Sequence, residues 1–280
     1  MKQFADESTT VGLWHFEETS GATQGDSSGN AYDLTDNANA PTRITTTDFG
    51  GGLSFNGTDD YTERSGGGAN LEATSITVEL LLFKPSPHSG DVDFVAAYEP
   101  RGSSFDGRGW RVIFLSTGIL RFDVGFGTGA YHPAADSGPF PLDRWVYVAG
   151  SFDSSTVKLY RCGTLITASA DAGTISYAAS PSAGATTFKT FVLGAEQQND
   201  AVYRNFGKCY VADLRVSNIA KSDAAIYNEQ LNQQYCEVEP QASPGTMAYG
   251  TDSMYPQGAY HKYKTIRAAV EMMNNLTLGP

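Results

Sequence analysis

From about residue 11 to residue 217, short runs of apolar and β-branched residues alternate with clusters of Gly, Asp, Asn, Ser and Pro. Almost no segment in this stretch has helical periodicity, and short apolar runs between turn residues are typical of β-strands. The pattern predicts ten strands, at 11–16, 52–55, 75–84, 93–98, 109–115, 119–126, 144–152, 156–161, 191–195 and 209–216. Ten strands suit two packed sheets, so we expect an all-β antiparallel sandwich.

Two turns and one central strand can be identified within this pattern. Thr117 and Gly118 lie between two apolar runs, and the triplet 153–155 (Asp-Ser-Ser) lies between two others, as hairpin turns do. In the run 145–152 both alternating faces are apolar, which predicts a central strand that is covered on both sides.

A helical pattern replaces the strand pattern after residue 216. Ser222 precedes apolar residues spaced for one face of a helix, so we expect a short closing helix over 222–231 with Ser222 as its N-cap. A chain of 280 residues with 40% hydrophobic composition is long for one sandwich. The sequence therefore predicts a sandwich body at 1–236 and an extension at 237–280.

The extension has a composition of its own. Pro and Gly recur between 237 and 261, which excludes helix and sheet interior, and they alternate with tyrosines that are too numerous for an idle linker. Residues 265–276 carry the apolar stripe of a short amphipathic helix, which is marginal alone and must dock on the body or on a partner. We expect an arm that docks on other protein subunits, and its docking residues are Tyr249, Tyr255, Tyr260, Ile266, Val270 and Met273.

Charge and cysteine content narrow the set of partners. The formal net charge of −12 argues against nucleic acid, because like charges repel at long range. No stretch approaches the ~20 apolar residues that cross a bilayer, and the first seven residues lack the apolar core of a secretory signal. We expect no membrane insertion and synthesis without a signal peptide. Cys162, Cys209 and Cys236 lack C-x-x-C spacing, which favours reduced thiols over a zinc site.

Four segments carry a family pattern. They are 12–18 (GLWHFEE) with the loop 26–30 (DSSGN), 49–61 (FGGGLSFNGTDDY), 143–153 (DRWVYVAGSFD) with 159–163 (LYRCG), and 206–216 followed by 219–223 (IAKSD). Together they resemble the laminin-G-like jelly-roll domains of the concanavalin A-like lectin/glucanase superfamily over about residues 11–230. The family has Asn before the turn Gly, where this chain has Cys162. The resemblance implies a two-sheet sandwich and fixes no function, since the superfamily includes lectins, glycosidases, adhesion modules and parts of viral particles.

The resemblance also implies a structural Ca²⁺ site. Jelly rolls of this superfamily often hold a Ca²⁺ that clamps the first strand to the last, and the matching carboxylates are Glu17 or Glu18 and Asp213. Ca²⁺ takes about six to eight oxygen ligands, many of them carbonyls and waters that a sequence does not show. The alternative interpretation is that these residues only accept hydrogen bonds in loops.

The sequence gives no catalytic signature. A retaining glycosidase needs two carboxylates roughly 5 Å apart, and the superfamily's Glu-x-Asp-x-x-Glu signature is absent here. The four histidines are scattered, with no nucleophile motif beside any of them. We predict that the protein is not an enzyme, and a glycoside hydrolase is the least favoured hypothesis.

Glycan binding needs exposed aromatic side chains that stack on sugar faces, with polar groups nearby for the hydroxyls. The candidates are Trp110, Arg111, Tyr98, Tyr131 and His132. Trp110 fits a core position equally well, whereas Trp14 and Trp145 lie inside alternating strands and are expected in the core.

Two hypotheses of different classes follow. The favoured one is a structural role as an oligomeric subunit of a larger assembly, such as a viral particle's decoration, fibre or tail component, exposed at the virion or assembly surface and docked through the arm. The alternative is a carbohydrate-binding module or lectin of an extracellular protein, with or without Ca²⁺. The two are compatible, because the outer domain of a particle can also bind surface glycans.

Overall fold

The computed structural model describes residues 3–46, 50–64, 69–88, 90–98, 107–177, 190–199 and 202–233. Contacts between Cα atoms divide the chain into Met1–Glu237 and Val238–Pro280, and the second part lies outside the described residues. All six predicted docking residues of the arm belong to that second part.

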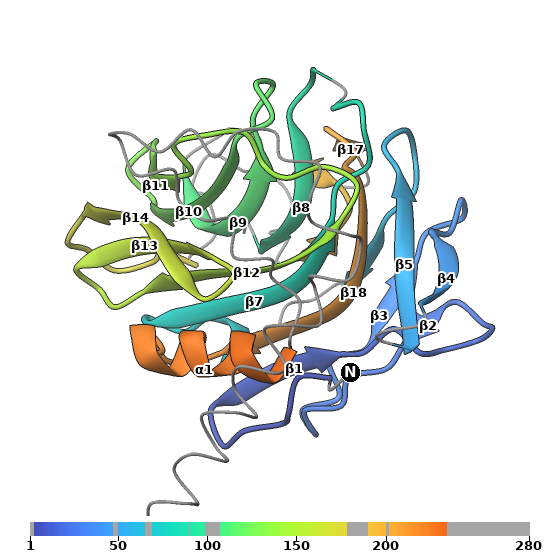
Figure 1. Ribbon diagram of the computed structural model, residues 1–280, viewed down its shortest axis with the longest axis horizontal. Coiled ribbons are helices and arrows are strands. Elements are labelled where there is room, and N and C mark those ends of the chain that lie inside the picture. The colour runs from blue at the N-terminus through green and yellow to red at the C-terminus, as the bar shows by residue number, and fades with distance from the viewer. Residues whose placement is uncertain are drawn as a thin grey trace, which may run out of the picture. The chain divides into compact units, whose positions relative to one another are not determined.

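Two eight-stranded sheets make up most of the described chain (Figure 1). The strands of sheet A are β1 (Thr10–Trp14), β4 (Thr42–Thr46), β5 (Gly50–Asn56), β7 (Ile76–Phe83), β12 (Trp145–Phe152), β13 (Thr156–Arg161), β14 (Thr164–Ala170) and β18 (Lys208–Ser217). The strands of sheet B are β2 (Thr23–Gln24), β3 (Leu34–Asp36), β6 (Thr62–Arg64), β8 (Asp93–Tyr98), β9 (Arg108–Phe114), β10 (Leu120–Phe126), β11 (Tyr131–Ala135) and β15 (Phe191–Leu193). The remaining elements are the hairpin β16 (Glu196–Asn199) and β17 (Val202–Arg204), the 3-10 helix η1 (Ala69–Leu71) and the helix α1 (Asp223–Gln233).

The pairing of the strands is antiparallel throughout both sheets. Sheet A has the order β14-β13-β12-β7-β18-β5-β4, and β1 pairs with β18. Sheet B has the order β11-β10-β9-β8-β15-β6-β3-β2. The architecture is therefore the predicted two-sheet sandwich, closed by one short helix among the described residues.

One large hydrophobic core fills the space between the inward faces of the sheets. Trp14 is completely buried, and its ring centre lies 5.2 Å from that of Phe191, which lies 5.6 Å from Trp110. The prediction for Trp14 is thus confirmed. Trp145, also expected in the core, is only partly buried at the start of β12, where its ring meets the edge of Phe83.

The predicted central strand is β12, and it is covered on both sides. Val146 and Val148 point into the core, while Tyr147 and Ala149 point to the outer side of sheet A. On that outer side they pack in a second apolar cluster that includes Phe4 and Ile226 of α1. The N-terminal segment and α1 therefore cover this face of the sheet.

Local sequence signals explain the turns and the start of the helix. Gly118 has a φ of 78°, and in the second turn Asp153 Oδ1 accepts the backbone N–H groups of Ser155 and Thr156 at 2.9 and 2.8 Å. At the start of α1, the backbone N–H of Ala225 donates to Ser222 Oγ at 3.2 Å. All ten predicted strands are present, with ends that differ by at most two residues.

The cysteines differ from the expectation of reduced thiols. Cys209 is a free and fully buried thiol, and burial raises its pKa to about 12. Cys162 is disulfide-bonded, so the expectation is wrong for this residue. It shares a two-residue turn with Gly163, and both residues have the positive φ that such a hairpin turn requires, 53° and 70°.

Candidate ligand-binding groove on sheet B

Two of the five residues predicted to bind a ligand lie in the core. Trp110 on β9 and Tyr98 on β8 are both 0% exposed. Side chains alternate along a strand, so Trp110 shares the inward face of sheet B with Val112, two residues on. Neither ring can stack on a ligand from solution, and the expectation of exposed platforms is wrong for both residues.

Arg111 and Tyr131 lie together on the outer face of sheet B. The guanidinium carbon of Arg111 is 3.8 Å from the centre of the Tyr131 ring. His132, the next residue on β11, points to the other side, where its ring stacks on Phe126 at 4.1 Å and its Nδ1 lies 3.0 Å from Asp171. The structure therefore groups Arg111 with Tyr131 and separates His132 from them.

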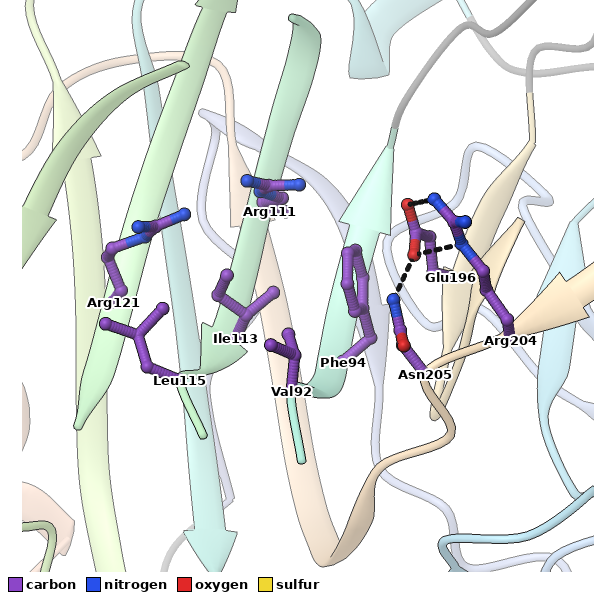
Figure 2. A pocket seen from close by; sticks show the side chains of 9 residues that line it. All are labelled: Val92, Phe94, Arg111, Ile113, Leu115, Arg121, Glu196, Arg204 and Asn205. Carbon is purple, nitrogen blue, oxygen red and sulfur yellow. Dashed lines mark hydrogen bonds and ion pairs between the residues drawn. The ribbon is translucent and has the colours of Figure 1, made fainter. Parts of the chain in front are cut away.

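The outer face of sheet B contains a groove of about 240 Å³, here called the arginine groove (Figure 2). Its lining is apolar at Val92, Phe94, Ile113 and Leu115, and polar at Arg111, Arg121, Glu196, Arg204 and Asn205. Figure 2 shows Arg111 and Arg121 on one side of Phe94 and the three other polar residues on the opposite side. Pockets for drug-sized ligands hold roughly 300–1,000 Å³. The arginine groove therefore suits a unit the size of one sugar ring or one side chain.

Alternation along the strands produces this lining. On β9, Trp110 and Val112 face the core, so Arg111 and Ile113 must face outward. On β8, an irregular register between Phe94 and Ala96 turns Phe94 to the outer face. Sequence reasoning missed this apolar strip, although both faces of β8 are rich in apolar residues.

One wall of the groove depends on the close approach of another segment to β8. The backbone N–H of Phe94 donates to the carbonyl oxygen of Asn205 at 3.0 Å. A Cβ atom on Gly207 would lie 2.1 Å from the Phe94 carbonyl oxygen, so only glycine permits this contact. Gly207 thereby holds Asn205 and Phe206 beside the strand.

One buried carboxylate pairs with two of the three arginines that line the groove. Asp123 on β10 is completely buried, and its Oδ2 accepts hydrogen bonds from Arg111 Nε at 2.7 Å and Arg121 Nη2 at 2.8 Å. Arg121 Nε also lies 2.7 Å from Asp123 Oδ1, in a contact that is not aligned as a hydrogen bond. Across the groove, Arg204 Nε and Nη2 donate to Glu196 at 2.9 and 3.2 Å. Two guanidiniums thus share one carboxylate, while the third has a carboxylate of its own.

A second hollow of about 650 Å³ adjoins the arginine groove, and the two share Val92 and Asn205. Its lining is mostly polar and consists of Asn56, Gly57, Gly90, Asp91, Val92, Asp93, Ser116, Asn205, Phe206 and Lys208. Asp93 is paired with the buried ammonium of Lys84, which also donates to the Lys208 carbonyl oxygen at 2.8 Å. The two neighbouring hollows are together called the recess here, with an apolar, arginine-bearing part and a polar part.

The hairpin β16–β17 brings aromatic side chains to the same side of the molecule. The rings of Tyr61 and Tyr203 are stacked at 3.9 Å, and the ring of Phe206 lies 6.4 Å from Tyr61. All three side chains are partly exposed. Tyr203 Oη donates to a carboxylate oxygen of Glu63. The signal in the sequence for this pair is weak, because the two tyrosines lie far apart in the chain, Tyr61 just before β6 and Tyr203 on the short strand β17.

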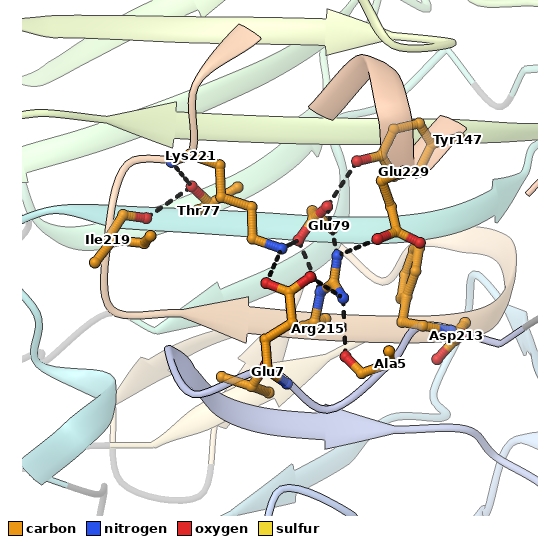
Figure 3. Close-up of polar contacts among 12 residues, drawn as sticks. Ala5, Glu7, Thr77, Glu79, Tyr147, Asp213, Arg215, Ile219, Lys221 and Glu229 are labelled. Carbon is orange, nitrogen blue, oxygen red and sulfur yellow. Dashed lines mark hydrogen bonds and ion pairs between the residues drawn. The ribbon is translucent and has the colours of Figure 1, made fainter. Parts of the chain in front are cut away.

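The outer face of sheet A holds a cluster of charged groups that is covered by the chain itself (Figure 3). Glu79 on β7 accepts hydrogen bonds from Arg215 Nε at 2.8 Å, Arg215 Nη2 at 2.9 Å and Tyr147 Oη at 2.7 Å. Arg215 also donates to the Ala5 carbonyl oxygen at 2.9 Å and to Glu229 of α1 at 2.9 Å. This clasp cluster binds the N-terminal segment and α1 to the sheet.

The charged groups of the clasp cluster are paired with one another. Burial alone would raise the pKa of Glu79, but Arg215 and Lys221 outweigh it and hold the pKa below its ordinary value. Burial and the neighbouring Glu79 raise the pKa of Tyr147 well above its usual range. Lys221 Nζ lies 2.8 Å from Glu79 and 2.9 Å from Glu7. With its charges paired and solvent excluded, the cluster is a structural device rather than a ligand site.

Two of the three residues expected to hold Ca²⁺ make hydrogen bonds within the chain. Asp213 Oδ2 accepts the backbone N–H of Phe4 at 2.6 Å, and its Oδ1 lies 3.1 Å from His15 Nδ1. Glu18 Oε1 accepts the backbone N–H of Gly25 at 2.7 Å, and Glu17 is exposed. In the part of the chain that the structure describes, no three His, Cys, Asp or Glu side chains are grouped to hold a metal ion. The geometry agrees with the alternative interpretation of Glu18 and Asp213 as hydrogen-bond acceptors.

Among the described residues, neither α1 nor η1 has the length and apolar character needed to cross a membrane. The predicted docking residues Tyr249, Tyr255, Tyr260, Ile266, Val270 and Met273 lie outside the described residues.

Comparison with known proteins places the sandwich in context. A laminin-G-type family model, described as concanavalin A-like lectin/glucanases superfamily, matches residues 56–227, which is more than half of the chain. A comparison with curated proteins gives no match.

Similar solved structures include binding domains of clostridial toxins. The receptor-binding domain of botulinum neurotoxin mosaic serotype C/D matches with a TM-score of 0.59 and 12% identity over 80% of this chain and 51% of the toxin domain. The binding domain of botulinum neurotoxin DC in complex with rat synaptotagmin II matches with a TM-score of 0.58 and 11% identity. The match covers 82% of this chain and 53% of the toxin chain. Botulinum neurotoxin type C, whose cell entry is dependent upon interaction with two ganglioside molecules, matches with a TM-score of 0.57 and 11% identity over 81% of this chain and 52% of the toxin chain. The chain spans about half the length of these chains, and identities this low show a shared fold alone.

Proposed function

Because the chain belongs to the concanavalin A-like lectin/glucanase superfamily, we propose that it is a non-enzymatic recognition domain that binds a glycan in the recess on the outer face of sheet B. The arginine groove carries this proposal. Its apolar strip is partly exposed at Val92 and Leu115, whereas Phe94 is buried, and guanidinium and amide donors lie on both sides. A sugar ring has an apolar face of C–H groups and a rim of hydroxyls, and this lining complements both.

The second hollow supports a ligand longer than one sugar unit. Asn56, Asp91 and Ser116 supply side-chain donors and acceptors of the kind that hydroxyl groups need. The two hollows share Val92 and Asn205, so an oligosaccharide that occupies both would lie across these two residues. A peptide strand would instead be expected to pair with a sheet edge, whereas this recess lies on a sheet face.

The carboxylates around the recess favour binding over catalysis. Asp123 is held by Arg111 and Arg121, and Asp93 is held by Lys84. Hydrolysis of a glycosidic bond requires two carboxyl groups that flank the scissile bond, one of them as a general acid. Carboxylates that are already committed to cations of the chain do not provide that arrangement.

The similar structures support recognition as a use of this fold. Among them are a toxin binding domain in complex with rat synaptotagmin II and a toxin whose cell entry depends on gangliosides. A protein ligand is therefore the second candidate for the recess. The hypothesis of a virion or assembly subunit depends on the arm at 237–280, which lies outside the described residues, and it stays a prediction, as does the alternative extracellular location.

A glycan array probed with the full chain tests the proposal. Val92 lies in both hollows and is partly exposed, so Val92→Trp fills the recess with an indole and is expected to abolish binding to every glycan that the unchanged protein retains. The matched control is Leu165→Trp, which places the same ring at an exposed position of β14 in sheet A, where the leucine is 38% exposed. Equal binding by the unchanged protein and Val92→Trp would remove the recess as the site.

A further inference from the structure

One edge of sheet A lacks the features that protect the other edge strands of the two large sheets. Exposed edge strands pair readily with other chains, so proteins shorten them, cover them, or place charges or proline in them. Among the described strands, β2 has only two residues, and all five residues of β1 are buried. Strand β11 contains Pro133, and β4 contains Arg43, whose Nη2 lies 3.3 Å from Asp36 of sheet B. Strand β14, with the sequence TLITASA, has none of these features.

The outer edge of β14 has no partner strand among the described residues (Figure 1). Within that part of the chain β14 pairs only with β13, and the backbone groups of 164–170 make no hydrogen bonds outside this pair. Every residue of β14 is exposed or partly exposed. A register irregularity between Leu159 and Tyr160 of β13 affects only the start of β14, and 167–170 run in regular antiparallel register with 156–159. Because alternate residues of an antiparallel edge strand point their N–H and C=O groups away from the sheet, β14 can accept one more strand.

This edge carries no charge, on a protein whose formal net charge is −12. No charged residue lies in β14, and the two cationic side chains of the neighbouring strand β13 are paired within the chain. Lys158 Nζ lies 2.9 Å from Asp223, and Arg161 Nη1 lies 2.6 Å from Asp136. Two copies of the chain can therefore pair along this edge without placing like charges opposite each other.

Apolar side chains of α1 lie beside the start of β14. Tyr227 and Leu231 are about one helical turn apart, and they are 49% and 38% exposed. A Cβ atom on Gly163, in the turn before β14, would lie 3.1 Å from the Cα atom of Tyr227, so α1 crosses this turn. Burial of such side chains against another chain is favourable, and tyrosine is enriched in interfaces. This apolar surface extends the region that a second chain can contact.

From these features we infer that β14 pairs with β14 of a second copy of this chain, antiparallel and about a two-fold axis at Thr167. Such an interface is isologous and closes after two copies, and the outer edges of the joined sheet are then the two β4 strands, which contain Arg43. The cross-strand pairs in this register are Thr164 with Ala170, Leu165 with Ser169, Ile166 with Ala168, and Thr167 with Thr167. None of them joins like charges, and Thr–Thr pairs across strands are stabilising.

The pairing edge and the recess belong to different parts of the sandwich. The recess lies at β8, β9 and the hairpin β16–β17, whereas β14 lies beside β11. Together with the proposed function, pairing gives the dimer two glycan sites, so binding to a surface with many glycans gains avidity. The control variant Leu165→Trp keeps an apolar side chain at the edge, and cross-strand pairs accept aromatic residues.

Light scattering on the full chain tests the inference. The mass is expected to be that of two chains and to fall toward that of one chain on dilution. Thr167→Lys places two ammonium groups opposite each other at the axis, so it is expected to weaken dimerisation at least about ten-fold. The matched control is Thr42→Lys, which changes an exposed threonine of β4 at the other edge of sheet A and is expected to leave the mass unaltered.

A charge exchange at Thr167 separates loss of pairing from loss of folding. Thr167→Glu also places like charges opposite each other and is expected to behave as a monomer by itself. An equimolar mixture of Thr167→Lys and Thr167→Glu is expected to dimerise again, because each ammonium group then faces a carboxylate. A variant that had merely lost its fold would not regain the mass of a dimer on mixing.

Thr167→Cys locates the axis directly. Residues directly opposite in an antiparallel pair have Cα atoms about 4.5–5.5 Å apart, within the range of about 4.4–6.8 Å that a disulfide spans. Mild oxidation is therefore expected to join two chains through the introduced cysteines. The control Thr42→Cys on β4 is expected to remain unlinked.

A mass of one chain at every concentration would overturn the inference and leave this edge to an extended peptide of another protein. A dimer that Thr167→Lys leaves unchanged would also overturn it, because the contact would then lie elsewhere on the chain. Monomers in the mixture of the Lys and Glu variants would overturn the two-fold register at Thr167. None of these outcomes bears on glycan binding, which Val92→Trp tests separately.

Discussion

The outer faces of the two sheets contain similar charged groups in opposite situations. On sheet A, Arg215 and Glu79 are 0% exposed beneath the N-terminal segment and α1, which supply further partners of their own. On sheet B, the side chains of Arg121 and Arg204 are 22% and 46% exposed. Of the apolar residues that line the same groove, Val92 and Leu115 are partly exposed. Arginine and carboxylate groups close one face of the sandwich, whereas on the other they border a recess.

The two faces differ in what covers and pairs with their charged groups. In the clasp cluster the chain provides the cover, the counter-charges and the hydrogen-bond acceptors, so a ligand has nothing to add. In the arginine groove the guanidiniums of Arg121 and Arg204 are partly exposed, so a ligand can contact them. Removing a charge from the closed face should therefore cost stability, while removing one from the open face should cost binding.

The largest expected effect comes from Arg215→Met. Glu79 would remain buried without its main partner, and breaking a buried ion pair from one side costs about 3–5 kcal/mol. Urea denaturation followed by circular dichroism measures the change in the free energy of unfolding. The double variant Glu79→Leu with Arg215→Met is expected to lose less than the sum of the two single losses, because it leaves no unpaired charge. Strict additivity would show that the two side chains are not coupled.

Phe4→Ala is expected to have a somewhat smaller effect. The Phe4 side chain is 2% exposed, its ring lies 5.9 Å from that of Tyr147, and the Arg215 guanidinium lies 4.9 Å from it. Truncation of a buried Phe to Ala costs about 3–5 kcal/mol, and Phe4 lies at the lower end because it belongs to a segment outside the strands, which can adjust. Limited proteolysis should also cleave the N-terminal segment faster. A rate equal to that of the unchanged protein would contradict the clasp.

Arg121→Gln provides the contrast on the open face. Asp123 keeps Arg111 as a partner at 2.7 Å, and the Arg121 side chain already reaches solvent, so the expected loss of stability is about 1 kcal/mol or less. The same urea denaturation measures it. A loss as large as that of Arg215→Met would mean that the groove is a second structural cluster, and the distinction between the two faces would fail.

The core and its strands could be predicted from the sequence because burial leaves a periodic signal. All ten predicted strands are present, and in eight of them most residues are buried. The strands that sequence reasoning missed are short or polar. An example is β14, whose residues are all partly or fully exposed, so that no alternation of apolar and polar positions marks it.

The candidate site was only partly predictable, for a reason that the same strands illustrate. A run such as 108–114 has apolar residues on both faces, and the sequence does not say which face meets the core. The sequence was therefore compatible with Trp110 in the core or at the surface. The register of the strands places Trp110 inside, while Arg111 faces outward. Arg121, Arg204 and Phe94 come from three separate strands or hairpins, and their proximity depends on strand order, which periodicity does not encode.

The smallest expected effect concerns His15, which belongs to the edge of the closed face. Burial lowers the pKa of His15, but the contact with Asp213 outweighs it, so the pKa in the folded protein lies above the ordinary value of 6.5. A raised pKa means that the folded state binds the proton more tightly than the unfolded state. The stabilisation is then fully present below pH 6.5 and is lost as the pH rises through the pKa of the folded protein.

His15→Gln tests this sign. The difference in unfolding free energy between the unchanged protein and the variant is expected to be larger at about pH 6 than at about pH 8.5, as measured by urea denaturation at both values. The matched control is His132→Gln on sheet B. It removes an imidazole whose Nδ1 lies 3.0 Å from Asp171 and whose side chain is 27% exposed. A difference that stays constant with pH would show that protonated His15 does not help to hold Asp213, and with it the backbone of Phe4, in the clasp.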